Sequence, residues 1–187
     1  KFTRGQPPAG TNAPQPEPAT PVALNTTYPV PTNIAWTLDL TNAVLPDTPA
    51  AGSIHGSGFF CERAVLRGGL LNLNQGQAPP WDLGMSLGLI ARRGEELSGK
   101  TVVIAPDRPQ APRVVLRWKD EQQQPVTEDF NHGYALKVTF GQATNKHIPG
   151  KIYLCLPDTA RSFVAGSFDA EIRKPPPPKS SAPKKGS

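Results

Sequence analysis

The sequence is poor in the side chains that bind metals or carry out covalent catalysis. Its 187 residues include two cysteines and three histidines, and none of these stand at the short spacings that place two zinc ligands on one element. It also contains no glycine-rich string of the P-loop or dinucleotide-binding type. We therefore expect no metal site and no cofactor, and the sequence offers no catalytic residue to name.

Long apolar runs are absent as well. No stretch approaches the roughly 20 apolar residues that a membrane-spanning helix needs, so no membrane span is expected in this chain. The sequence begins at Lys1 rather than at methionine, and we expect any signal or anchor to lie upstream. A segment rich in Thr, Pro and Gln that leads into an all-β domain is typical of stalked proteins. An extracytoplasmic location (periplasmic, cell-surface or secreted) is therefore expected.

Positive charge is in excess, but not in the middle of the chain. Lysine and arginine total 20 against 15 acidic residues, a net charge of +5, whereas residues 33–173 hold 14 of each. A domain that binds nucleic acid normally gathers positive charge on a folded face, so no nucleic-acid partner is expected. Most of the surplus lies in 174–187. We interpret these lysines as a solubilising tail, or as one that makes weak contact with an anionic surface.

Proline marks the two ends of the chain. Of the 23 prolines, eight lie in residues 1–32 and five in 174–187. The sequence therefore predicts a Pro-rich flexible linker over 1–32, a β-sandwich domain over 33–173 and a Pro/Lys-rich disordered tail over 174–187. The middle part is long enough to bury a sizeable core.

Apolar residues in the middle part recur at every second position, which is the period of a half-buried strand. Because parallel pairs need crossover connections of about a dozen residues, we expect antiparallel pairing. The prediction is an all-β, antiparallel two-sheet sandwich, jelly-roll-like, with about nine strands. The expected strands are 34–40, 59–66, 70–74, 83–89, 101–105, 113–118, 134–140, 151–156 and 163–172, with a helical turn within 92–99 and a polar loop over 120–132.

Two local features of the strands stand out. Phe163 and Phe168 are out of phase in the closing hairpin 148–172, and one extra residue at Gly166–Ser167 would restore the register, so we predict a β-bulge there. In 83–89 the large side chains share one face, and the other face carries only glycine and serine. Such a bare face usually has another segment of the chain lying against it, and a ligand is the alternative.

The two cysteines, Cys61 and Cys155, both fall in predicted strands. They could form one disulfide, which requires Cα atoms within about 7 Å and would restrain a long loop by about 4–5 kcal/mol. Two buried free thiols are the alternative. The sequence leaves both open.

Trp81 is the strongest candidate for a ligand contact. It follows two prolines in a loop and precedes Asp82, and an indole face with an acceptor beside it suits stacking on a sugar ring. Phe130 is a second, weaker platform. The alternative is that Trp81 folds over an edge of the sandwich as part of the core, as expected of Trp36 and Trp118.

No catalytic constellation is recognisable. The histidines, His55, His132 and His147, are expected in exposed turns, and Ser57 lacks the glycine frame and the helix of a nucleophile elbow. The strand series resembles bacterial carbohydrate-binding and cell-surface sandwich domains in architecture alone. We therefore expect a non-catalytic accessory domain that binds a glycan or a protein partner through loops at one end. A structural or assembly domain that acts through exposed edge strands comes second, and a hydrolase of unknown type third.

Overall fold

The computed structural model describes residues 29–41, 43–76, 79–91 and 93–175. The linker predicted over 1–32 and the tail predicted over 174–187 lie outside these ranges, apart from their innermost residues. Within them no helix is long and apolar enough to cross a membrane.

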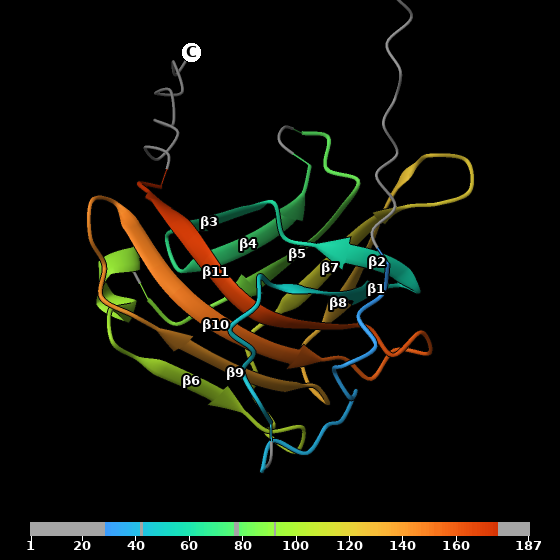
Figure 1. Ribbon diagram of the computed structural model, residues 1–187, viewed down its shortest axis with the longest axis horizontal. Helices are drawn as coiled ribbons and strands as arrows, with labels where there is room; N and C mark the ends of the chain where they lie inside the picture. Colours follow the sequence, from blue (N-terminus) through green and yellow to red (C-terminus); the bar gives the residue numbers. More distant parts are fainter. Residues whose placement is uncertain (1–28, 42, 77–78, 92, 176–187) are drawn as a thin grey trace, which may run out of the picture.

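The fold is all-β, as predicted, and its strands form a single curled sheet that resembles half a barrel (Figure 1). One short 3-10 helix, η1 (Gly94–Leu97), lies within the predicted helical turn. The described residues form eleven strands: β1 (Ala51–Ile54), β2 (Ser57–Phe60), β3 (Arg63–Arg67), β4 (Leu70–Gln75), β5 (Leu83–Gly88), β6 (Thr101–Ile104), β7 (Val114–Lys119), β8 (Pro125–Phe130), β9 (Ala135–Phe140), β10 (His147–Cys155) and β11 (Phe163–Arg173).

The connectivity differs from the expected pair of antiparallel sheets. One hydrogen-bonded path runs β6-β9-β10-β11-β3-β4-β5-β7-β8, and β1 and β2 branch from β11. β11 pairs with β3 in parallel, from Ala170 opposite Ala64 to Arg173 opposite Arg67. The rule that a short connection makes two strands antiparallel applies to strands that follow one another in the sequence. It does not apply to β3 and β11, because seven other strands lie between them in the chain.

The main core fills the inner face of the curled sheet. It takes the alternating apolar residues of nearly every strand, and Leu66, Leu71, Met85, Leu116 and Leu136 are each fully buried. The period-two pattern therefore predicted the inward side chains correctly, since alternate residues of a strand point to opposite faces.

The segment that was predicted as the first strand, 34–40, makes no strand. Its alternating side chains, Ile34, Trp36, Leu38 and Leu40, pack instead on the outer face of β10 and β11, against Tyr153, Cys155, Phe163 and Ala165. The prediction was wrong because an extended segment that lies on a sheet buries alternate residues just as a strand does. We call residues 34–41 and 43–45 the covering segment.

The predicted β-bulge at Gly166–Ser167 is also absent. β10 and β11 pair in one unbroken register from His147 opposite Glu171 to Cys155 opposite Phe163. Phe163 and Phe168 are out of phase because they face opposite sides of the sheet, and both sides are covered. Gly166 serves a close approach: its φ is +134°, and a Cβ there would lie 2.6 Å from the carbonyl oxygen of Thr48.

The predicted strand 59–66 is divided at Cys61 and Glu62 into β2 and β3. Two further strands were missed in the sequence. β8 was predicted as a polar loop because it is an edge strand whose outward residues are polar and exposed. β1 was missed because its four residues, two of them Gly52 and Ser53, carry little apolar signal. Both follow from the weak pattern of short or edge strands.

Candidate anion-binding site

The proposed aromatic platform is split by the fold. Phe130 is 9% exposed and belongs to the main core, so it offers little ring surface to a ligand. It ends β8, whereas Lys119, which contacts Asp82, pairs with Pro125 at the start of β8. Phe130 and Asp82 therefore do not share a binding surface.

Trp81 and Asp82 lie in the loop before β5. Trp81 is half-buried beside the turn at Gly76, and exposed Asp82 accepts a hydrogen bond from Lys119 at 2.5 Å. The carboxylate therefore already has a partner. Sugar stacking on Trp81 remains a prediction.

Cys61 and Cys155 are free thiols and belong to different clusters. Cys61 packs against the main core, while Cys155 lies on the outer face beneath the covering segment. The structure thus has free thiols rather than a disulfide, with Cys155 buried and Cys61 partly buried. Burial raises the pKa of Cys61 to about 12 and also raises that of Cys155.

The histidines are exposed, as expected, and two of them have partners. The ring of His55 stacks on Trp118, which packs against the core, with centroids 4.2 Å apart and planes 12° apart. His147 Nδ1 lies 2.9 Å from Asp169 Oδ2. Within the ranges described, no three His, Cys, Asp or Glu side chains are grouped so as to hold a metal ion.

A hollow of about 1200 Å³ opens at the C-terminal end of β11. Segments from four parts of the chain surround it: the end of β11, the β3–β4 turn, the start of η1 and the turn before β10. Five cations line it, Arg67, Arg93, Lys146, Arg173 and Lys174, against two carboxylates, Glu95 and Glu171. We call it the basic hollow.

Glycine lets η1 form one wall of the basic hollow. Gly94 is buried against the inner side of the sheet, and a Cβ there would lie 2.8 Å from Cγ2 of Ile172 and 3.1 Å from Leu66. Any larger residue would push η1 away from β11. The close contact holds Arg93 and Glu95 at the rim.

Lys146 is held in a strained backbone conformation. Asn145 and Lys146 form the tight turn before β10 with φ of 49° and 64°, values that favour Asn and Gly. The N–H of Ile172 donates to the carbonyl of Lys146 at 2.6 Å, which fixes the turn against β11. The positive φ of Lys146 suits glycine, and a lysine adopts it at a cost of about 1–2 kcal/mol. Such strain points to a functional role for the side chain.

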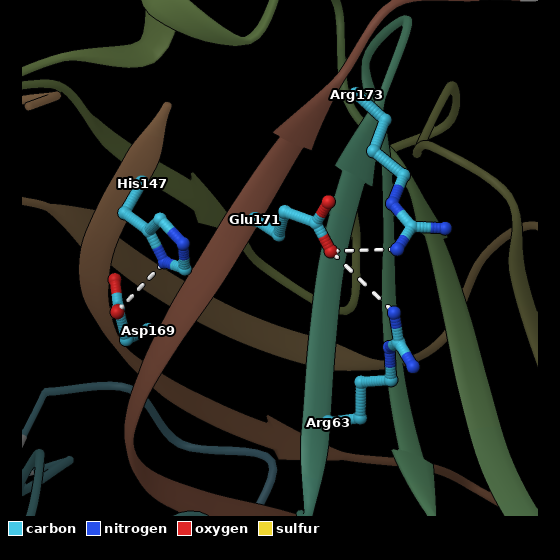
Figure 2. Close-up of polar contacts among 5 residues, drawn as sticks. All are labelled: Arg63, His147, Asp169, Glu171 and Arg173. Atoms are coloured by element: carbon cyan, nitrogen blue, oxygen red, sulfur yellow. Dashed lines mark hydrogen bonds and ion pairs between the residues drawn. The ribbon is translucent and has the colours of Figure 1, made fainter. Parts of the chain in front are cut away.

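Glu171 lies between two arginines on the outer face of the sheet (Figure 2). Its Oε2 accepts a hydrogen bond from Arg173 at 2.7 Å and a longer one from Arg63 at 3.5 Å. The hydrogen bond from Arg173 is the main reason that the pKa of Glu171 is lowered. One carboxylate therefore serves two guanidinium groups, and Arg173 donates to it through one of its nitrogens.

Four cations of the basic hollow remain, Arg67, Arg93, Lys146 and Lys174. Among the described residues, no ion pair involves Arg67, Arg93, Lys146 or Lys174. Facing cations repel one another, and an anion between them relieves that repulsion. The arrangement can therefore bind carboxylate, sulfate or phosphate groups through charge-assisted hydrogen bonds.

The sequence did not reveal this site because its cations come from distant positions. The formal neutrality of residues 33–173 concealed them, since it averages over faces that differ in charge. The one available signal was the Asn145–Lys146 pair after a strand, which indicates a tight turn. Comparisons of this chain with protein families, with curated proteins and with solved structures find no match.

Proposed function

We propose that this chain is a non-catalytic binding domain that takes an anionic glycan in the basic hollow. The observation that carries the proposal is the group of four cations around one cavity that have no carboxylate partner among the residues the structure describes. Binding of this kind needs positioned positive charge and no reactive group.

The lining of the basic hollow favours a glycan over a protein partner. Protein interfaces draw most of their affinity from buried aromatic and apolar anchors. Here the side chains are mainly long cations, and Ile172 and Pro175 are the apolar exceptions. A hydrophilic, charged ligand fits such a surface better. The Thr-, Pro- and Gln-rich sequence before residue 33 supports the extracytoplasmic location that belongs to this proposal.

The test uses dextran sulfate as the anionic glycan and unmodified dextran as its neutral match. We expect retention on immobilised dextran sulfate that falls as salt rises, because salt screens the attraction, and no retention on dextran. Arg67→Ala should weaken binding by about three- to tenfold, the effect of losing one charge-assisted contact at a solvated site. Arg108→Ala removes an exposed arginine from the loop after β6 and should change little.

Lys146→Gly separates binding from folding. Glycine adopts the positive φ of residue 146 without strain, so this variant should be as stable as the parent or more so. It should nevertheless bind dextran sulfate more weakly. An equal loss of dextran sulfate binding in Arg67→Ala and Arg108→Ala would show that the basic hollow is not the binding site. Unchanged binding by Lys146→Gly would show the same.

An assembly domain is the second candidate. β6 and β8 end the strand order, so among the described strands each is paired on one side only, and Val103 of β6 is 48% exposed. Such edges can pair with another chain. Light scattering over a wide concentration range tests this candidate, and a constant monomer mass would count against it.

A further inference from the structure

The bare strand face predicted at 83–89 is occupied by an arginine. Gly84, on the outer side of β5, pairs with Asn74 of β4 and with Arg117 of β7. The guanidinium of Arg117 reaches back across Gly84, and its Nη2 donates to Asn74 Oδ1 at 3.0 Å. A Cβ on Gly84 would lie 2.7 Å from that oxygen and 3.5 Å from Arg117 Nη2. The glycine is therefore what lets the arginine lie flat on the sheet.

Arg117 has neutral partners only. Its Nη1 donates to Ser86 Oγ at 2.9 Å, and Ser86 in turn donates to Asn72 Oδ1 at 2.6 Å. No ion pair joins Arg117 to a carboxylate in the part of the chain that the structure describes. Its Nε is buried and has no hydrogen-bond partner there. The arginine four residues earlier, Arg113, is paired through two nitrogens with Asp129.

An uncompensated, half-buried cation is unfavourable without an anion. Burial lowers the pKa of Arg117, yet a guanidinium stays charged in proteins. Of its five N–H donors, two are used by Asn74 and Ser86 and the Nε–H is enclosed. One N–H on each Nη remains for an outside acceptor. Each of these donors can bind an oxygen of a carboxylate, sulfate or phosphate in a charge-assisted hydrogen bond.

Arg117 lies on the same face of the sheet as the arginines near the basic hollow. Arg173 pairs with Arg67, Arg63 pairs with Asn74, and Asn74 pairs with Gly84 beside Arg117. Directly paired residues point to the same side of a sheet. Four strand spacings separate β11 from β7, about 19 Å along the curved sheet at about 4.8 Å each. The covering segment packs elsewhere, on the outer face of β10 and β11.

We propose that Arg117, with Asn74 and Ser86 as its supports, forms a second anion subsite, and that the ligand is a polyanionic chain long enough to reach from the basic hollow to β7. This inference rests on the proposed function and gives it a substrate class, an extended acidic polysaccharide rather than a short acidic sugar. Arg63 lies between the two subsites, where Glu171 holds it.

Sulfated dextran oligosaccharides of two lengths test the proposal. The short one spans less than about 10 Å and the long one more than about 25 Å, so only the long one can reach across the about 19 Å of four strand spacings. The variant is Arg117→Gln, and its control is Arg113→Gln, which changes the arginine just before β7, an even number of residues from Arg117. Arg117→Gln should weaken binding of the long oligosaccharide about tenfold and leave the short one within twofold. Arg113→Gln should leave both within twofold.

Thermal melting establishes that each variant is folded. If Arg117→Gln unfolds, Arg117→Lys replaces it, because lysine keeps the charge but not the paired donors. The long oligosaccharide should then bind more weakly and the short one as before. Equal effects of either variant on both lengths, or no effect on the long one, would overturn the proposal. Arg67→Ala and Lys146→Gly could leave binding intact while Arg117→Gln weakens it. That result would show that the basic hollow does not bind the ligand and that Arg117 binds anions as a separate site. It would overturn the proposal that one ligand bridges the two.

Discussion

Trp36 and Leu156 are joined by a hydrogen bond from the indole Nε1 to the backbone carbonyl oxygen, 3.1 Å long. Beside it, the hydroxyl of Tyr153 lies 3.1 Å from the carbonyl oxygen of Ala35 and 3.2 Å from that of Thr37. The covering segment is thus held to the sheet by side chains that bond to backbone, in addition to its apolar contacts.

Tyr153→Phe should loosen the covering segment. The variant removes the hydroxyl and leaves two carbonyl groups without that donor, so the free energy of unfolding should fall by about 1–2 kcal/mol. Urea denaturation measures this loss. Labelling of Cys155 under native conditions should accelerate, while Cys61, in the other cluster, serves as an internal control. Equal acceleration at both thiols would indicate global rather than local opening.

Both thiols should resist alkylation in the native protein. The thiolate is the reactive form, and with a pKa of about 12 Cys61 stays protonated at pH 8.5. Cys155 is fully buried. Iodoacetamide should therefore modify neither residue within the time that modifies both in urea, as read by mass spectrometry. A disulfide found between them in the purified protein would contradict the structure.

Gly166→Ala should be among the most destabilising small substitutions in the chain. The new Cβ would lie 2.6 Å from Thr48 O and 2.7 Å from Ala50 Cα, at a φ of +134°, so overpacking adds to backbone strain. We expect a loss of about 3 kcal/mol in the free energy of unfolding. Gly56→Ala is the control, because its φ is +80° but nothing lies within 4 Å. Its cost should be about 1 kcal/mol.

Glu171 should restrain anion binding in the basic hollow. Glu171→Gln releases Arg63 and Arg173 from their shared carboxylate, so dextran sulfate should bind more tightly to the variant. The pKa of Glu171 is lower in the folded state than in the unfolded state. Ionised Glu171 therefore stabilises the fold at a pH above its unfolded pKa, and this stabilisation is lost as the pH falls through its folded pKa. The parent should therefore lose stability in acid more steeply than Glu171→Gln. Weaker binding by the variant would argue that Glu171 orients the arginines for the ligand.

Trp81→Ala separates a glycan platform from a packing role. Trp81 is half-buried beside Gly76, so we expect a loss of about 1–2 kcal/mol of stability and unchanged binding of dextran sulfate. Retention on a panel of neutral polysaccharides measures the alternative. Retention by the parent that Trp81→Ala abolishes at unchanged stability would establish Trp81 as a binding residue.

The period-two pattern predicted the inward side chains of β4, β5, β7, β9 and β10, because side chains of a strand alternate between faces. It could not distinguish the covering segment from a strand, since both bury alternate residues. Nor could it show that both faces of β11 are buried, one around Phe163 and the other around Phe168. The outer face is buried because the covering segment reaches β10 and β11, a long-range contact.

The candidate sites were harder to predict than the fold. The bare face at Gly84 was recognised as a place of close approach, but which side chain lies there is set by the pairing of β5 with β7. The basic hollow needs the parallel pairing of β11 with β3 to bring Arg173 beside Arg67. Neither register is encoded locally, so neither site could be assembled from the sequence.

The place of β11 in the sheet has a consequence for biosynthesis. β11 is the last strand described, yet it lies between β10 and β3 in the strand order. While the ribosome is still translating residues 163–173, β10 and β3 each present an open edge that only β11 can fill. The growing chain cannot complete its sheet strand by strand as it emerges, and such edges invite aggregation. Nascent chains stalled before residue 163 should therefore remain protease-sensitive and bound to chaperones, and folding should follow the release of β11.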